Sequence, residues 1–444
     1  MVVDPGRKAE LVALNIHVPK IIFCAILVAG GLLLLRAIRG RSDELRWWRR
    51  LILALLAGRA ALGIGLYLVA PQLVAYSDAV AYYLPQAQAA LGGAVPYRDF
   101  ATNYSPLFPY LLAPGVALWP TAGSIVATMI VAEAAMVLLY LRHVAGRGAT
   151  GPGPTKTDPG RALLAHQAMF LYLIAPMSTY RVAITGYNSV LVAFFALLAL
   201  ILADRRRDGW AAAMAVLGLW TTKLLALITW PAVAWYRPEG RWRRTAILAG
   251  GLLLLLALPL AGIDTLQPLK AEGESYTDGN LWFPLLVFLP ALHGTAFMNL
   301  APPLCYLLAA AWVGWRHHRA LAAETDRFTA ASALLSSLGL LLMLLSKKSQ
   351  PIYLLMVLPF LLHVLAVRGR LDRWTLAAWA WLGLTTTIHV HAAFIDEILA
   401  SRQLLQGPRG WATLLGELAT VASYLLLLAR SLPRRGRSAE RGLS

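Results

Sequence analysis

Charged residues are scarce in this chain of 444 residues. They account for 14% of it, whereas soluble domains carry about a quarter. Hydrophobic residues make up 59%, and the mean hydropathy is +0.62. This composition excludes a soluble globular protein and predicts a multi-pass membrane protein, because so apolar a chain needs lipid rather than water around it.

Cysteine and the common cofactor motifs are also scarce. The only two cysteines, Cys24 and Cys305, lie in apolar runs, which excludes a disulfide framework and a thiolate metal site. The sequence lacks the Walker, dinucleotide-binding and zincin patterns, and it shows no internal repeat. Any chemistry must therefore come from single residues in the loops and at the ends of apolar runs.

Apolar runs long enough to cross about 30 Å of hydrocarbon recur along the chain. The first is expected to be a spanning helix rather than a cleavable signal peptide. We therefore expect an all-α fold, a polytopic transmembrane helical bundle of about 12–14 helices. The runs lie near 18–38, 51–71, 105–141 (one short and one full helix), 162–178, 189–203, 210–236 (one helix or a broken pair), 246–262, 295–315, 329–345, 352–367, 374–393 and 411–430.

The positive charge follows the membrane pattern. The net charge is +18, but the arginines form short runs between apolar segments, as the positive-inside rule predicts for cytoplasmic loops. This distribution argues against a nucleic-acid partner. It places the loops around Asp78, Asn188, Lys347 and Glu397 outside, and it predicts one transmembrane domain over 1–430 with a basic cytoplasmic tail at 431–444, in a cell inner or plasma membrane.

The first external loop, about 72–104, has a helical pattern. Asp78, Tyr82 and Gln86 recur every four residues, whereas Ala79, Tyr83, Ala87 and Ala90 occupy another face. This spacing predicts a short amphipathic helix at the membrane interface. Pro85 would kink that helix or start a second one.

The same loop resembles that of a known enzyme superfamily. The stretch from Ser77 to Pro85, the motif Pro-Tyr-Arg-Asp-Phe at 96–100 and Tyr-Ser-Pro at 104–106 are similar to the first external loop of GT-C integral-membrane glycosyltransferases, above all the polyprenyl-phosphate-mannose-dependent mannosyltransferases. The resemblance implies that Asp78 is the catalytic base, which takes the proton of an acceptor hydroxyl. A loop that only joins two spans is the alternative.

Two lysines run against the charge pattern. Lys347 and Lys348 lie on the predicted external side, ahead of an aromatic run that ends at Pro359. The resemblance implies that this turn lies near the donor phosphate, although the His pair of some relatives is missing. Alternatively, both lysines snorkel to lipid headgroups. Lys223 interrupts an apolar run, where a charge is expensive and often functional, or else it marks a helix break.

Two-carboxylate chemistry and metal binding are not expected. Asn188 stands where relatives often carry a second acid, and no Asp-x-Asp pair accompanies Asp78. We therefore expect a site without metal or other cofactor. The donor phosphate is assigned to Lys347, Lys348, Arg98 and Lys223, and the acceptor or sugar to Tyr82, Gln86, Tyr97, Asp99, Tyr104, Asn188 and Tyr276.

The function expected from these residues is an inverting membrane glycosyltransferase. Its partners would be a polyprenyl-phosphate sugar donor, a glycan or glycolipid acceptor, and membrane lipids. Mannose is the default sugar by resemblance, and arabinose and glucose stay open. A transporter or flippase of lipid-linked sugars is the main alternative. A lipid-linked polysaccharide ligase or polymerase is another, but the last external loop, about 394–410, is small for it.

Overall fold

The fold is all helical in the part of the chain that can be described. The computed structural model describes residues 5–38, 44–74, 77–146, 159–268, 277, 279–323, 326–388 and 407–433. Within these residues the regular structure consists of helices, with one isolated bridge between Pro96 and Phe100. The predicted all-α bundle is therefore confirmed.

Seven helices within the described residues are long and apolar enough to cross a membrane. They belong to α1 (Pro5–Ile38), α2 (Glu44–Val69), α5 (Ala122–Gly146), α11 (Arg241–Ala257), α14 (Ala296–Ala323), α15 (Arg327–Leu345) and α18 (Pro408–Ser431). The segments Gly160–Ile174 and Pro176–Ile184 would form an eighth span, which bends by 60° at the break before Pro176. A proline at this position explains the break, since it lacks the N–H that would continue the helix.

Shorter helices and turns complete the bundle. The α-helices are α3 (Leu84–Leu91), α4 (Phe108–Leu118), α6 (Pro159–Ile174), α7 (Pro176–Ser178), α8 (Ser189–Asp204), α9 (Asp208–Thr221), α10 (Trp230–Ala234), α13 (Trp282–Phe288), α16 (Leu358–Val367) and α17 (Arg373–Ile388). The 3₁₀ turns are η1 (Pro71–Val74), η5 (Leu224–Thr229), η6 (Leu258–Ala261), η7 (Pro290–Leu292) and η8 (Pro351–Met356), and the π-helical turns are η2 (Ala79–Tyr83) and η4 (Thr179–Ile184).

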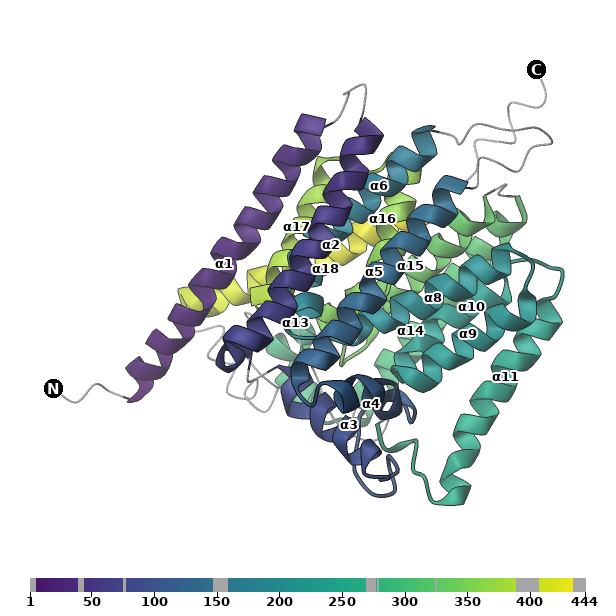
Figure 1. Ribbon diagram of the computed structural model, residues 1–444, viewed down its shortest axis with the longest axis horizontal. Helices are drawn as coiled ribbons and strands as arrows, with labels where there is room; N and C mark the ends of the chain where they lie inside the picture. The colour runs from purple at the N-terminus through teal and green to yellow at the C-terminus, as the bar shows by residue number, and fades with distance from the viewer. Residues whose placement is uncertain are drawn as a thin grey trace.

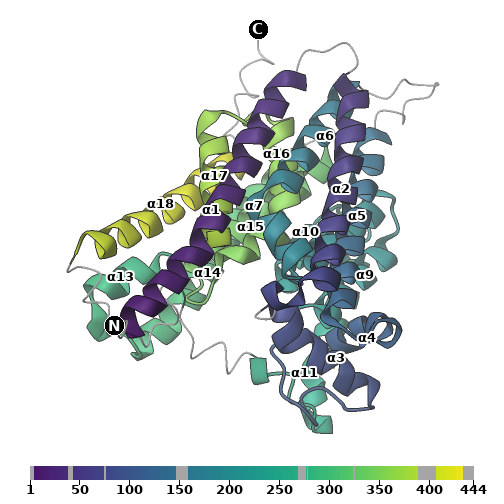
Figure 2. The same ribbon diagram turned by 60° about the vertical axis from the view of Figure 1, so that its left-hand side comes forward.

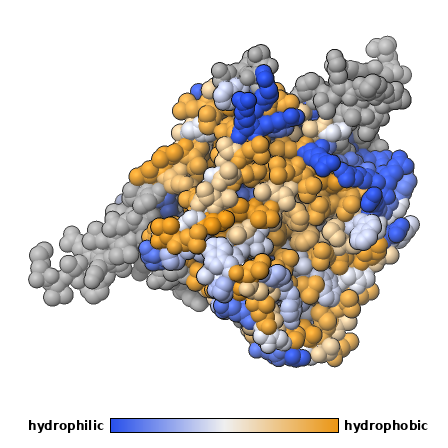
Figure 3. Space-filling model, in the orientation of Figure 1, coloured by the Kyte–Doolittle hydropathy of each residue, from blue (hydrophilic) through white to orange (hydrophobic). Residues whose placement is uncertain are grey.

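The bundle is layered around α15. In the apolar stretch of α15, 94% of the residues are buried, against 17% in α11 and in α14. The two outer helices expose leucines such as Leu253 and Leu307, which is the surface expected of a protein surrounded by lipid tails. Hydrophobic residues dominate the middle of the molecular surface, and hydrophilic ones gather toward the top and upper right (Figure 3).

The molecule has two chemically different ends. Helices α3 and α4 gather at the lower end in Figure 1, and the second view agrees (Figure 2). We call this the loop end, because it carries the loop that contains Asp78. Helix α8 begins at Ser189, after a turn that contacts this loop at Ala79, and it ends at Asp204 at the opposite end. There Asp204 accepts a hydrogen bond of 2.7 Å from Tyr236 and is followed in the chain by Arg205, Arg206 and Arg207. We call this second end the arginine end.

The two ends predict the outcome of a labelling experiment. In a background free of Cys24 and Cys305, single cysteines at positions 78 and 347 should react with an impermeant reagent from the same side of the membrane. Cysteines at the exposed positions 205 and 373 should react from the other side, because the positive-inside rule holds arginine-rich loops in the cytoplasm. Reaction of positions 78 and 347 from opposite sides would contradict this arrangement.

Candidate active site

Asp78 lies at the start of a packed loop. The face formed by Ala79, Tyr83, Ala87 and Ala90 is buried, as the helical pattern predicted, and it anchors η2 and α3 against the bundle. Helix α3 begins at Leu84 with Pro85 in its first turn. The carboxylate of Asp78 is therefore held half-buried at the loop end rather than free in solution.

The environment of Asp78 is cationic but dehydrated. Burial raises the pKa of the Asp78 carboxyl above its ordinary value of 3.8, and the positive charges of Lys223 and Arg181 act in the opposite direction. Burial disfavours the charged form of an acid, whereas neighbouring cations favour it. A carboxylate with a raised pKa is a stronger base than an ordinary aspartate, which suits proton abstraction from a hydroxyl.

Lys223 lies at a break between two helical segments. Helix α9 ends at Thr221, Lys223 is extended with φ −147° and ψ 154°, and η5 begins at Leu224. The end of α9 offers free carbonyl groups, which the Asp78 loop uses. The N–H of Ser105 donates to the carbonyl of Thr222 at 3.2 Å, and that of Leu107 to the carbonyl of Trp220 at 2.9 Å. The loop and the lysine are thus tied together.

Three tyrosines surround the ammonium group of Lys223. Its Nζ lies 5.2 Å from the ring centroid of Tyr104, 4.5 Å from that of Tyr187 and 4.9 Å from that of Tyr353. It also donates a hydrogen bond of 3.0 Å to the hydroxyl of Tyr187. All four side chains are buried. Aromatic faces attract a cation more strongly when water is excluded, so the charge of Lys223 is held in one position.

A cavity of about 730 Å³ opens beside this cage. Its lining includes Lys223, Lys347 and Lys348, the three lysines that the sequence assigned to a donor phosphate. Lys347 donates a hydrogen bond of 2.7 Å to Asn299, and burial lowers the pKa of its amine. Most of the remaining wall is apolar or proline-rich: Leu224, Leu225, Pro268, Pro302, Pro303, Tyr306 and Leu342. The cavity therefore combines a cationic side with an apolar side.

Other predicted residues support the loop instead of lining this cavity. Gln86 accepts a hydrogen bond of 2.9 Å from Thr102, and Tyr97 donates one to the carbonyl of Tyr104. Tyr97 has a φ of +66°, a strained backbone that the hydrogen bond helps to hold. Tyr82 is 56% exposed on the loop surface.

Arg98 and Asp99 pair with each other on the exposed part of the loop. The guanidinium makes two contacts of 2.9 Å with the carboxylate, and this pairing lowers the pKa of Asp99 to about 2. Neither residue lines the cavity. Tyr276 lies outside the described residues, as does Glu397.

Asn188 lies next to the cage. It is fully buried, and neither its Oδ1 nor its Nδ2 has a hydrogen-bond partner within the described residues. Buried polar atoms are nearly always paired. Asn188 does not line the cavity, so its predicted role in holding the acceptor or sugar stays a prediction.

The sequence did not predict Arg181, Tyr187 or Tyr353 as site residues. Arg181 lies in the π-helical turn η4 and its charge acts on Asp78. The other π-helical turn, η2, follows Asp78 directly, and such turns are frequent at functional sites. Arg181 is a cation among predicted external segments, which is the same signal that drew attention to Lys347.

No metal site is evident in the described residues, among which no group of three His, Cys, Asp or Glu side chains could hold an ion. The absence of a metal requirement nevertheless stays a prediction. The fold and this site together define a multi-pass, all-α membrane protein with an open, lysine-lined cavity at one end. One of its lysines, Lys223, acts electrostatically on the half-buried carboxylate of Asp78.

Among the solved structures that resemble this chain are two of one protein. They are crystal structures of ArnT from Cupriavidus metallidurans, one bound to undecaprenyl phosphate and one in the apo state. The bound structure is 13% identical in sequence, covers 88% of this chain and 78% of its own, and has a TM-score of 0.44. The apo structure is 14% identical, covers 81% of this chain and 73% of its own, and has a TM-score of 0.43. Both TM-scores lie below 0.5, so this likeness does not identify a family. No protein-family model and no curated protein matches the chain.

Proposed function

We propose that the protein is a membrane glycosyltransferase that moves a sugar from a polyprenyl-phosphate donor to a lipid-linked or envelope glycan acceptor. The observation that carries the proposal is the cavity lined by Lys223, Lys347 and Lys348, together with the action of the Lys223 charge on the carboxyl of Asp78. Transfer of a sugar from a phosphate to a hydroxyl is helped by a base for the hydroxyl proton and by fixed cations for the departing phosphate.

The donor fits the two sides of the cavity. Its phosphate would lie among the ammonium groups of Lys223, Lys347 and Lys348, where charge-assisted hydrogen bonds are strong. Its polyprenyl chain would follow the apolar wall at Pro302 and Tyr306. These residues belong to α14, whose outer face exposes leucines to the lipid phase. The membrane would thus deliver the donor laterally. Arg98 stays a predicted donor residue that lies outside this cavity.

The proposed reaction is a single displacement. Asp78 takes the proton of an acceptor hydroxyl while that oxygen forms a bond to the anomeric carbon. The bond between the anomeric carbon and the phosphate oxygen breaks at the same time, and the phosphate leaves with the electron pair. Negative charge grows on the leaving phosphate, so cations fixed around it favour the transition state over the bound substrate.

The acceptor and sugar would be held by the polar groups around the cage. Asn188 offers an unpartnered amide, and Tyr104 and Tyr187 offer aromatic faces and hydroxyl groups beside Lys223. Mannose is the proposed sugar by the resemblance of the Asp78 loop, with arabinose and glucose as the competing donors. The proposed location is a cell inner or plasma membrane, with the loop end outside.

A transporter or flippase of lipid-linked sugars is the second candidate. It is favoured by the broken helices, namely the 60° bend before Pro176 and the break at Lys223. Discontinuous helices are common where transporters bind their substrates. A transporter would move the intact donor across the bilayer, whereas a transferase would consume it.

The proposal can be tested directly with purified protein. Wild-type protein in lipid nanodiscs would be mixed with a panel of radiolabelled polyprenyl-phosphate sugars and a membrane lipid extract. We expect label to move from one donor to a new glycolipid or glycan product. Absence of transfer from every donor, together with translocation of intact donor in sealed vesicles, would favour the transporter instead.

Replacing both Lys347 and Lys348 with glutamine should lower turnover about 10-fold. Two fully buried charge-assisted contacts would be expected to contribute more, but both lysine side chains are only partly buried. The loss should appear mainly in kcat, since charge on the phosphate grows in the transition state. The measurement is kcat per folded protein in detergent. Unchanged turnover would contradict a role at the donor phosphate and would indicate that both lysines contact lipid headgroups instead.

A further inference from the structure

A second hollow lies at the arginine end, far from the proposed active site. Its volume is about 570 Å³, and it is lined by Arg206, Arg207, Asp208, Gly209, Trp210, Arg243 and Ile247. These residues come from the turn between α8 and α9, the first turn of α9 and the first turns of α11. The hollow therefore joins the ends of three helices.

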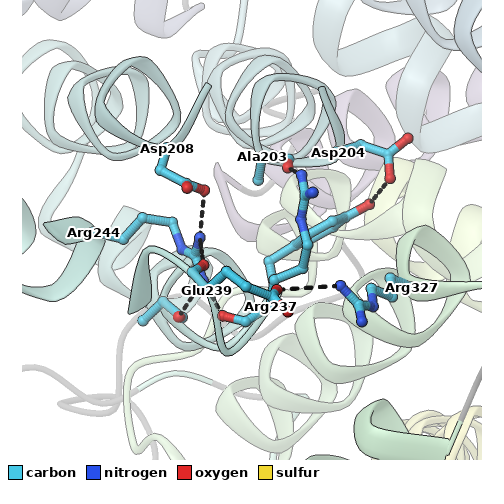
Figure 4. Close-up of polar contacts among 9 residues, drawn as sticks. Ala203, Asp204, Asp208, Arg237, Glu239, Arg244 and Arg327 are labelled. Atoms are coloured by element: carbon cyan, nitrogen blue, oxygen red, sulfur yellow. Dashed lines mark hydrogen bonds and ion pairs between the residues drawn. The ribbon is translucent and has the colours of Figure 1, made fainter. Parts of the chain in front are cut away.

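The charge of this hollow is positive and unneutralised. The guanidinium groups of Arg206, Arg207 and Arg243 are exposed, and within the described residues they form no hydrogen bond or ion pair. The carboxylate of Asp208 does not cancel them, because it is already paired with Arg244 (Figure 4). The hollow thus presents three cations that a single anionic group could bridge.

Arg244, which follows the lining residue Arg243 in the chain, is held by a network of hydrogen bonds behind the hollow. Arg244 is fully buried and donates hydrogen bonds to the carbonyls of Glu239 at 3.0 Å and Ala234 at 3.1 Å, in addition to Asp208. Figure 4 shows these contacts gathered around the turn between α10 and α11. Because Arg243 precedes Arg244 in the chain, its backbone position is fixed by this network.

Two local features shape the hollow for a ligand. Arg206 has a φ of +59°, a left-handed conformation that is strained for a residue with a side chain. The guanidinium of Arg243 lies against Gly209, where an added Cβ would be 3.0 Å from its Nη2 atom. Glycine at this position lets the arginine approach the first turn of α9, whose free N–H groups also favour an anion.

Exposed tryptophans place the hollow at the membrane surface. Trp210 lines it and is 64% exposed, and Trp242 beside it is 84% exposed. Tryptophan side chains concentrate at the level of lipid headgroups. The arginine end is the end that the positive-inside pattern assigns to the cytoplasm, where the leaflet carries anionic lipids.

We propose that this hollow binds the headgroup phosphate of an anionic phospholipid of the cytoplasmic leaflet. The phosphate is bridged by Arg206, Arg207 and Arg243, and the glycerol and the first acyl carbons lie along Ile247 and Trp210. The bound lipid ties the turn between α8 and α9 to the start of α11. This site is independent of the proposed transferase chemistry.

The experiment uses purified full-length protein in a neutral detergent, where no charged leaflet attracts the arginines diffusely. The unfolding midpoint is measured against added short-chain phosphatidylglycerol, phosphatidylcholine or inorganic phosphate. Phosphatidylglycerol is expected to raise the midpoint saturably, and the other two compounds to leave it unchanged at the same concentrations. An equal rise with inorganic phosphate would overturn the lipid proposal in favour of a soluble anion.

Two variants locate the effect. In the first variant, glutamine replaces all three of Arg206, Arg207 and Arg243. The affinity for phosphatidylglycerol should fall about 100-fold, because each arginine near a lipid surface contributes about 5-fold. The control replaces the exposed Arg50, Arg205 and Arg241 with glutamine. It removes the same charge from outside the hollow and should change the affinity by less than about 2-fold. Equal losses in the two triple variants would overturn the site.

Gly209→Leu tests the shape of the hollow without changing its charge. The new side chain would fill the hollow and displace Arg243, and leucine is a better helix former than glycine, so folding should be preserved. We expect phosphatidylglycerol affinity to fall about 10-fold or more. If Gly209→Leu binds phosphatidylglycerol as the wild type does, the hollow is not the binding site, whatever the folding of the triple variants.

Discussion

Replacing Asp78 with asparagine is expected to lower turnover by about 100- to 10,000-fold, which is the usual contribution of a general base. Asparagine has the size of aspartate and can form hydrogen bonds, but it cannot accept the proton of the acceptor hydroxyl. The buried face of Ala79 and Tyr83 holds the loop independently of the carboxylate, so folding and donor binding should persist. The measurement is kcat per folded protein, with donor affinity determined separately.

The pH dependence distinguishes a base from a structural residue. Burial raises the pKa of Asp78, and only the ionised carboxylate can take a proton. Activity of the wild type should therefore fall as the pH drops through this raised pKa, at a pH above the ordinary value of 3.8. We call this decrease in activity at low pH the acidic limb of the pH profile. The residual activity of Asp78→Asn should lack the acidic limb. Glu239→Gln, an exposed carboxylate at the arginine end, is the control and should keep both turnover and limb.

Replacing Lys223 with methionine should lower turnover about 10- to 150-fold, the range expected for one lost contact to an ionised group. Methionine fills a comparable volume and packs well against aromatic rings, so the cage of Tyr104, Tyr187 and Tyr353 should stay folded. The buried position of Lys223 makes this loss larger than that expected from the partly exposed Lys347 and Lys348. The measurement is again kcat per folded protein.

The same variant should shift the acidic limb. The positive charge of Lys223 favours the ionised form of Asp78, so its removal should raise the pKa of the carboxyl and move the limb to higher pH. Lys347→Met removes a charge from the same cavity but does not act on Asp78. It should lower turnover without moving the limb. A limb that moves equally in both variants would show that Lys223 has no special relation to Asp78.

Local sequence patterns were sufficient for several parts of the fold. The run at 105–141 was expected to contain a short and a full helix, and it forms α4 and α5. The broken pair within 210–236 is present, with Lys223 at the break. The face of Ala79, Tyr83, Ala87 and Ala90 is buried as its spacing indicated. Each of these features depends on residues within about ten positions in the sequence. Hydrophobic periodicity and helix-breaking prolines are signals over the same short range.

The construction of the site depends on contacts that no local pattern contains. Tyr187 lies in the turn before α8 and Tyr353 in the 3₁₀ turn η8, and only the packing of η8 against α8 brings them to Lys223. The charge of Arg181 acts on Asp78, and Arg181 follows the break that ends α6 before Pro176. Conversely, Arg98 and Asp99 are adjacent in sequence and neutralise each other on the surface. Their type and position suggested a binding role, but a charge pattern cannot show which partner a side chain selects.

The configuration of the transferred sugar tests the central claim most directly. With Asp78 as the base and with Asn188 unable to act as a nucleophile, the reaction should be one displacement at the anomeric carbon. NMR of the product formed from a donor of known anomeric configuration should therefore show inversion. Retention would require either two displacements through a covalent intermediate, as in retaining glycosidases, or attack from the side of the leaving phosphate. Either route would contradict the assignment of Asp78 as the base of a direct inverting transfer.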